Sequence, residues 1–280
     1  MADSELVFEV VEGWGRLPEG WEFKHVAGVA VDSRDRVYVL NRGEHPVIVF
    51  SREGEFIKSW GEGVFANAHG AYIDARDNVF CVDNADHTVR KFTTDGELLM
   101  TIGTRGVPGE GGAPFNRPTK AALTPEGEIY VSDGYGNNRV HRFSAEGEHL
   151  LSWGEPGTGP GQFNLPHGVW YREGRVYVAD RQNDRIQVFT PEGEFVEEWG
   201  DLIRPCDLYI DSAGLVYVPE LRHRVSVLGL DGELLARWGG VESWESGLFV
   251  APHCTWTDSE GSLYVGEVLE GQRIQKFVRR

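Results

Sequence analysis

Hydrophobic and polar residues alternate along the whole chain in short runs that end at turn residues. The most regular runs read Val-Tyr-Val or a close variant, at 37–39, 79–82, 129–131, 176–178, 216–218 and 263–265. β-Branched and aromatic residues that alternate between glycine and aspartate turns are typical of strands. Each run ends in Asp, Asn or Glu and is followed by another strand. The pattern predicts an all-β protein built from six similar units.

Most units close with an acidic-Gly-Glu hairpin and a fourth strand that ends on Trp-Gly. Five such hairpins begin at residues 53, 95, 146, 192 and 231, and glycine accepts the positive φ that a tight hairpin requires. We expect their ten acidic side chains to form a solvated rim. We expect the closing tryptophans to pack one unit against the next rather than to stack on a ligand: Trp60, Trp153, Trp199 and Trp238.

The sixth unit stops at residues 277–280, before its own fourth strand. The segment 6–11, which Gly13-Trp14-Gly15 follows, has the pattern of that missing strand. Pairing of this N-terminal strand into the last blade would close the ring without an open interface. Six four-stranded blades of about 40–50 residues predict a six-bladed β-propeller, as a single domain over residues 1–280.

Composition narrows the partners and the compartment. The formal net charge of −17 argues against nucleic acid and anionic membranes, which both select basic surfaces. No stretch is apolar over the length of a membrane span, and Met1 to Val11 shows no secretory signal. Three widely spaced cysteines without a CxxC motif indicate a reducing compartment, so we expect a cytoplasmic protein: Cys81, Cys206 and Cys254.

The residue that opens the first strand of each blade should face the central axis. Around the ring this axial position holds Ala27, His69, Thr119, His167, Cys206 and His253. Histidine occupies every second blade, and alternate positions of a six-fold ring lie about 120° apart, so the three imidazoles can converge. Three neutral imidazoles with an open position form a catalytic zinc site.

His69, His167 and His253 therefore predict a site for Zn²⁺ or another divalent transition metal. The alternative is a set of hydrogen-bonded histidines that line a wet channel. The other histidines fall at turns, loops or outer strands, where we expect them to be solvated: His25, His45, His87, His141, His149 and His223.

The loop after the second strand should open on the mouth of the tunnel. It carries Arg42 in blade one, Tyr135 between two glycines in blade three, and Arg181 in blade four. A tyrosine can act as a base beside a cation, and arginine is a cation that keeps its proton. We therefore predict catalytic roles for Tyr135, Arg42 and Arg181. The alternatives are ion pairs with neighbouring blades for the arginines and loop filling for Tyr135.

Two family resemblances follow from these motifs. The segment Asp180-Arg181-Gln182-Asn183-Asp184-Arg185-Ile186-Gln187-Val188-Phe189 resembles the NHL repeat, and the likeness extends along the chain. It implies a propeller, which serves as a binding platform in some proteins and as an enzyme in others. A closer resemblance is to the peptidyl-α-hydroxyglycine α-amidating lyases. It is carried by 115–119, 131–140, 161–167 and 178–183, together with 41–45, 68–70 and 252–253.

The second resemblance implies that zinc binds His69, His167 and His253, that Tyr135 is catalytic, and that Arg42 and Arg181 are functional. The family also holds a structural Ca²⁺ through backbone carbonyls, here those of Val29 and Ala71, and through an aspartate. Cys254 stands in place of that aspartate, so the Ca²⁺ is doubtful in this chain. The two disulfides of the family have no counterpart, because other residues stand at cysteine positions: Gly136, Val176 and Val188.

Together these features predict a metal-dependent lyase that cleaves the carbinolamide-type C–N bond of a small or peptide-like substrate. Two alternatives stay open. One is a hydrolase or another lyase that uses metal-bound hydroxide at the same site. The other is a non-enzymatic platform whose loops bind a protein. The sequence does not indicate the oligomeric state.

Overall fold

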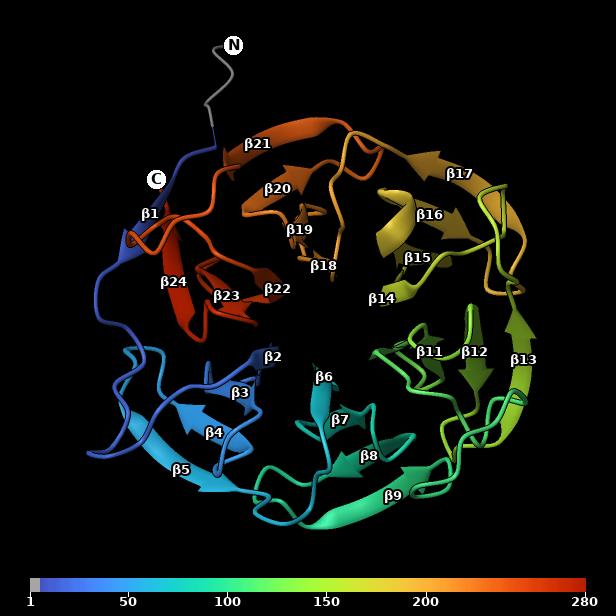
Figure 1. Cartoon of the computed structure of the whole chain (residues 1–280), viewed down its shortest axis with the longest axis horizontal. Coiled ribbons are helices and arrows are strands. Elements are labelled where there is room, and N and C mark those ends of the chain that lie inside the picture. The colour runs from blue at the N-terminus through green and yellow to red at the C-terminus, as the bar shows by residue number, and fades with distance from the viewer. Residues whose placement is uncertain (1–5) are drawn as a thin grey trace.

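Six four-stranded sheets stand around a central axis in this computed structural model, as the blades of a propeller do (Figure 1). This confirms the predicted all-β, six-bladed fold. The structure describes residues 6–280. The first five residues of the segment that was searched for a secretory signal, Met1–Val11, therefore lie outside the described residues. Nothing helical within residues 6–280 is long and apolar enough to cross a membrane.

Strands follow one another from the axis to the rim in each of the first three blades. Blade 1 contains β2 (Val26–Val31), β3 (Val37–Asn41), β4 (Val47–Phe50) and β5 (Phe56–Trp60). Blade 2 contains β6 (Ala68–Ile73), β7 (Val79–Asp83), β8 (Thr88–Phe92) and β9 (Leu98–Ile102). Blade 3 contains β10 (Lys120–Leu123), β11 (Ile129–Asp133), β12 (Arg139–Phe143) and β13 (His149–Trp153).

The remaining blades repeat this order, and the last one borrows its rim strand from the N-terminal segment. Blade 4 contains β14 (Pro166–Arg172), β15 (Arg175–Asp180), the 3₁₀ turn η1 (Arg181–Asn183), β16 (Arg185–Phe189) and β17 (Phe195–Trp199). Blade 5 contains β18 (Tyr209–Ile210), β19 (Val216–Glu220), β20 (Arg224–Leu228) and β21 (Leu234–Gly239). Blade 6 contains β22 (Pro252–Thr257), β23 (Leu263–Glu267), β24 (Ile274–Arg279) and β1 (Phe8–Val11).

The closing tryptophans pack against the next blade, as predicted, and Trp60, Trp153 and Trp199 contact its hairpin glycine there. A Cβ atom at Gly96, in the hairpin of blade 2, would lie 2.8 Å from the ring of Trp60 in blade 1. The same contact recurs between Gly193 and Trp153, and it is possible only because glycine has no side chain. The acidic residues beside the hairpin glycines are all exposed, which confirms the solvated rim.

The ring closes where the two ends of the chain meet. β1 pairs antiparallel with β24, with Phe8 opposite Arg279 and Val11 opposite Lys276, which confirms the predicted closure. The Phe8 ring stacks on Trp238 of blade 5, with centroids 5.1 Å apart and planes inclined by 14°. Aromatic stacking thus joins blades 5 and 6, where no acidic-Gly-Glu hairpin is present in the sequence.

The Trp–Gly contact gives a stability prediction. Gly96→Ala should destabilise the protein by about 1–3 kcal/mol more than Gly20→Ala, because the new methyl group overpacks Trp60. Gly20 is the matched control: its φ is +81° against +88° at Gly96, but nothing lies within 4 Å of its Cβ position. Urea unfolding of the two variants measures the difference. Equal losses of stability would show that the glycine is needed for its backbone conformation alone.

Candidate metal centre

Irregular pairing at the start of the innermost strands directs the histidines toward the axis. In β14 the register passes from Pro166 to Gly168 and leaves His167 without a partner in the neighbouring strand. The same irregularity in β22 leaves His253 without a partner. In β6 the unpartnered segment includes His69. A β-bulge of this kind re-aims a side chain. The tunnel wall at this level is formed by the six axial residues named from the sequence, together with three of their neighbours.

In each blade, a buried side chain at the end of the second strand accepts a hydrogen bond from the backbone of the segment that leads into the innermost strand. The Asp180 carboxylate accepts the backbone N–H of Asn164 at 2.7 Å, three residues before His167. The Glu267 carboxylate accepts the backbone N–H of Val250 at 2.6 Å, three residues before His253. The same spacing recurs in the other blades, where the acceptor side chains are Asn41, Asp83, Asp133 and Glu220.

The three histidines meet on the axis. Their ligand atoms all lie within 4.8 Å of one another, and the side chains are buried. Each Nδ1 lies at hydrogen-bonding distance from a backbone carbonyl of the next blade, so it must carry the proton and donate. The pairs are His69 Nδ1 with Thr119 O at 2.8 Å, His167 Nδ1 with Cys206 O at 2.5 Å, and His253 Nδ1 with Ala27 O at 3.0 Å.

With the proton on Nδ1, each Nε2 presents its lone pair to the axis, where it can bind a ligand. A second partner on Nδ1 that fixes the tautomer is typical of metal-binding histidines. Burial lowers the pKa of His69, His167 and His253 well below the usual range. The charge of Arg42 lowers all three pKa values further, and that of Arg181 lowers those of His167 and His253. Neutral imidazole is the form that binds a metal. The triad could therefore hold a metal ion with the donor set of a three-histidine zinc site.

Tyr135 and the two predicted arginines lie around this triad. The Tyr135 hydroxyl is 3.1 Å from Nε2 of both His69 and His167. Arg42 donates from Nε to the carbonyl of Ala68 at 2.9 Å and lies beside the Tyr135 hydroxyl. The Arg181 guanidinium carbon is 5.5 Å from the centroid of the Tyr135 ring. The structure thus brings together the predicted metal ligands and the predicted catalytic residues.

Comparisons with known proteins assign the family. The sequence model of the NHL repeat matches residues 115–143 and 163–189. NHL repeat-containing protein 3 of Homo sapiens is 30% identical to this chain, with 98% of the chain and 85% of that protein covered. The chain belongs to the NHL-repeat proteins. This confirms the resemblance to the NHL repeat that was found in the sequence.

The NHL-repeat chain is also similar to a protein named probable peptidyl-alpha-hydroxyglycine alpha-amidating lyase, from Caenorhabditis elegans. The two are 34% identical over 51% of this chain and 43% of that protein. Among solved structures, a protein of unknown function from Bacteroides thetaiotaomicron superposes with a TM-score of 0.75 and 20% identity. That match covers 99% of this chain and 77% of the other, and it shows the fold alone.

An ion pair that the sequence reasoning missed lies just below the histidines of this NHL-repeat protein. Lys120 Nζ is 2.7 Å from Asp207 Oδ2, and both side chains are about 95% buried, with exposures of 4% and 5%. Lys120 directly follows the axial residue Thr119, and Asp207 directly follows Cys206. Comparison of the residues after the axial position in all blades would have shown these two opposite charges.

The Lys120–Asp207 pair bears on the structural Ca²⁺ that the family resemblance implies. Asp207 already binds an ammonium group, and the neighbouring Cys254 offers a thiol whose pKa is raised by burial. Ca²⁺ prefers several carboxylate and carbonyl oxygens. The side chains at this level therefore do not fit a Ca²⁺ site.

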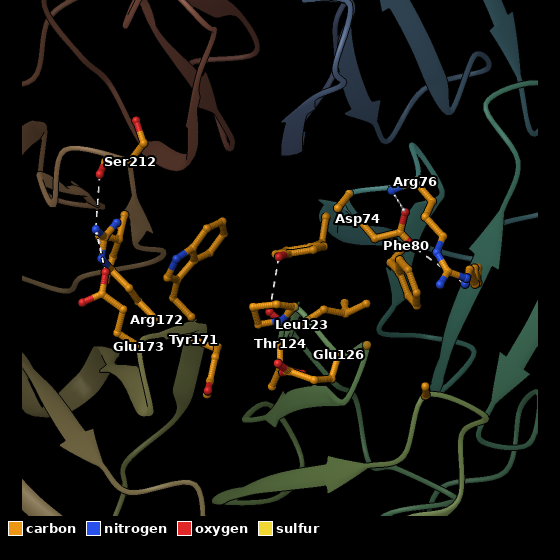
Figure 2. Close-up of a pocket in the computed structure, with 18 of the residues that line it drawn as sticks. Asp74, Arg76, Phe80, Leu123, Thr124, Glu126, Tyr171, Arg172, Glu173 and Ser212 are labelled. Carbon is orange, nitrogen blue, oxygen red and sulfur yellow. Dashed lines mark hydrogen bonds and ion pairs between the residues drawn. The ribbon is translucent and has the colours of Figure 1, made fainter.

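A larger cavity, of about 720 Å³, lies at the opposite end of the innermost strands. Figure 2 shows its walls, with Leu123 and Thr124 from blade 3 and Tyr171 and Arg172 from blade 4. Packed aromatic rings lie between this cavity and the histidine level, among them Trp170 and Trp256 with centroids 5.1 Å apart. None of the predicted site residues lines this cavity.

One prediction about the remaining histidines was wrong. His141 is fully buried on β12, with Nε2 3.3 Å from Asp133 Oδ2 and Nδ1 2.7 Å from Ser152 Oγ. The third strand of a blade lies between its neighbours, so its inward side chains are enclosed. At the equivalent position of blade 4, the buried Gln187 side chain donates a hydrogen bond to Asp180 of its own blade. His141 therefore supports the blade rather than facing solvent.

The lowered pKa values predict how the stability of the metal-free protein depends on pH. An unfolded histidine has a pKa of about 6.5, whereas these three are well below that value when folded. As pH falls below about 6.5, the unfolded chain binds protons that the folded chain excludes, so stability must fall. The loss is at most about 1.4 kcal/mol per pH unit for each histidine.

Urea unfolding between pH 8 and 5 measures this slope. His253→Gln should flatten it by the share of one histidine, and the slopes of variant and wild type should agree above pH 7, where all the imidazoles are neutral in both states. Equal slopes for variant and wild type at pH 5–6 would mean that His253 takes up a proton as readily in the folded as in the unfolded protein.

Proposed function

We propose that this NHL-repeat protein is a metal-dependent lyase that cleaves the C–N bond of a carbinolamide. The single observation that carries the proposal is the meeting of three neutral imidazoles at one point, with the Tyr135 hydroxyl 3.1 Å from two of them. Supporting it, a relative from Caenorhabditis elegans that is 34% identical over 51% of this chain is named as a probable amidating lyase.

His69, His167 and His253 would hold the metal, which is Zn²⁺ or another divalent transition metal. When bound there, the metal supplies a Lewis acid for the hydroxyl oxygen of the substrate. The histidines contribute neutral donors whose orientation is already fixed by the carbonyls of Thr119, Cys206 and Ala27. Each ring orientation is therefore set before the ion binds.

Tyr135 would take the proton from the substrate hydroxyl. As that O–H bond breaks, the oxygen forms a carbonyl, the C–N bond breaks, and the nitrogen leaves with the bonding pair and takes up the proton that Tyr135 accepted. The products are an amide and an aldehyde or keto acid, and no water is consumed. The Arg42 guanidinium, beside the Tyr135 hydroxyl, would stabilise the ionised tyrosine oxygen that accepts this proton.

Arg181 would hold a carboxylate or carbonyl oxygen of the substrate. Within residues 6–280 its Nε atom is buried and has no hydrogen-bond partner, and the same is true of one terminal nitrogen of Arg42. A buried donor without a partner is costly. An oxygen of the substrate would satisfy these donors, and arginine can bind a carboxylate through two parallel hydrogen bonds.

A protein-binding platform is the second candidate. NHL repeat-containing protein 3, which aligns with 98% of this chain, is named for its repeats alone. On this alternative any metal is structural. Elemental analysis of the purified protein tests the lyase, which requires one divalent metal ion for each chain. Absence of a stoichiometric metal would favour the platform.

Tyr135→Phe tests the catalytic role directly. We expect it to keep its metal and to lose about 10²–10⁴-fold in turnover of an α-hydroxyglycine amide, because the proton acceptor is removed. His167→Ala should lose both metal and turnover. Tyr171→Phe, at the opposite face, is the control and should keep both. Turnover of Tyr135→Phe equal to that of wild type would exclude this role for the tyrosine.

Product analysis in water enriched in heavy oxygen separates the lyase from a hydrolase at the same site. Carbinolamide cleavage moves the hydroxyl oxygen of the substrate into the carbonyl product, so the newly formed carbonyl group should carry no label. The carbonyl product must be trapped at once, because aldehydes exchange oxygen with water. Heavy oxygen incorporated into the product by the enzyme would favour hydrolysis by metal-bound hydroxide.

A further inference from the structure

Arg117 faces the same tyrosine as the proposed catalytic arginines, although the proposed mechanism gives it no role. It lies in the segment before β10, with a φ of +66°, which a non-glycine residue rarely adopts. Two hydrogen bonds hold this backbone. The N–H of Arg117 donates to His87 Nδ1 at 3.0 Å, and its carbonyl accepts the N–H of Tyr135 at 3.4 Å. The chain at Arg117 is therefore fixed against the loop that carries Tyr135.

Two guanidinium groups contact the Tyr135 ring. The guanidinium carbon of Arg117 is 5.2 Å from the ring centroid, and that of Arg181 is 5.5 Å from it. Arg117 is exposed, whereas Arg181 reaches down to the level of the Cys206 thiol. With Arg42 beside the hydroxyl, three positive charges surround one side chain at the mouth of the tunnel.

In the described part of the chain, these charges do not form ion pairs. Among residues 6–280, no carboxylate oxygen forms an ion pair with Arg42, Arg117 or Arg181. This is notable in a chain with 44 acidic and 27 basic residues. Asp133 precedes the loop that carries Tyr135, and Asp180 directly precedes Arg181. Both acids are buried and already accept hydrogen bonds from the backbone amides of earlier segments. Repulsion among the three arginines is thus left for a ligand to offset.

We propose that Arg117 is a second anion-binding residue and that the substrate is a dianion. One carboxylate would bind at Arg181, and a second negative group, on the part of the substrate nearer to solvent, would bind at Arg117. The position of the first carboxylate rests on the proposed function. The second follows from the unpaired guanidinium of Arg117. The substrate class is therefore a carbinolamide derived from a dicarboxylic acid or from an acidic peptide.

Binding of unreactive anions tests this proposal without requiring turnover. Calorimetry on the metal-loaded full chain would compare glutarate with butyrate, a monocarboxylate with a carbon chain of nearly the same length. Wild type should bind glutarate about tenfold more tightly, which is the contribution of one additional charge-assisted hydrogen bond. Arg117→Gln should lose this preference and keep its affinity for butyrate, and Arg117→Lys should keep most of the preference.

Arg139→Gln is the matched control. Arg139 is an exposed arginine at the start of β12 in the same blade, and its side chain bonds only the carbonyl of Glu110, at 3.4 Å. We expect this variant to keep the preference for glutarate. Metal content and circular dichroism of each variant establish that it is folded.

The outcomes distinguish this proposal from the proposed function. A glutarate preference that survives in Arg117→Gln, or that is absent from wild type, overturns the dianion proposal whether or not the protein is a lyase. A preference that depends on Arg117 supports it, even if no carbinolamide is turned over. Equal loss of glutarate and butyrate binding in Arg117→Gln also overturns it, because Arg117 would then act on the first carboxylate.

Discussion

The hydrogen bond between a buried side chain and the chain that enters each innermost strand is the constraint on which the rest of the molecule depends. It recurs in all six blades at the same spacing, three residues before the axial position. Burial raises the pKa of one of these acids, Asp180, so the arrangement costs free energy. A buried amide without such a partner would cost about 1–3 kcal/mol. The acceptor therefore determines where the axial side chain stands.

The six blades repeat one backbone arrangement, and the residues that differ between equivalent positions form the candidate metal centre. Every blade presents one residue to the axis, but only alternate blades present an imidazole. The blades between them present a backbone carbonyl that receives the Nδ1 proton of the neighbouring histidine. One ring of equivalent positions thus contains both the donors for a metal and the groups that orient those donors. At the next ring position, blades 3 and 5 differ from the others by the buried ion pair of Lys120 and Asp207.

The fold could be read from the sequence because the period is explicit, and even the closure by β1 follows from one missing strand. Convergence of the three histidines could be predicted because equivalent residues of a symmetric ring must point to a common axis. The Lys120–Asp207 pair was missed because its residues come from blades 3 and 5 and lie one position after the axial residues, a ring position that the pattern of histidines does not include. Arg117 lies in a segment that differs between the blades, so no equivalent position could place it. His141 was wrongly expected in solvent because strand order alone does not show which side of a strand is enclosed.

Closure of the ring by β1 and β24 affects how the protein is made. β1 leaves the ribosome before every other described strand, and its partner β24 is the last of these strands to follow. Blades 1–5 can form their sheets during translation, but β1 has no native partner until β24 has been made. An exposed strand edge is open to pairing with other chains. The nascent chain must therefore keep β1 unpaired while the strands of blades 1–5 are made.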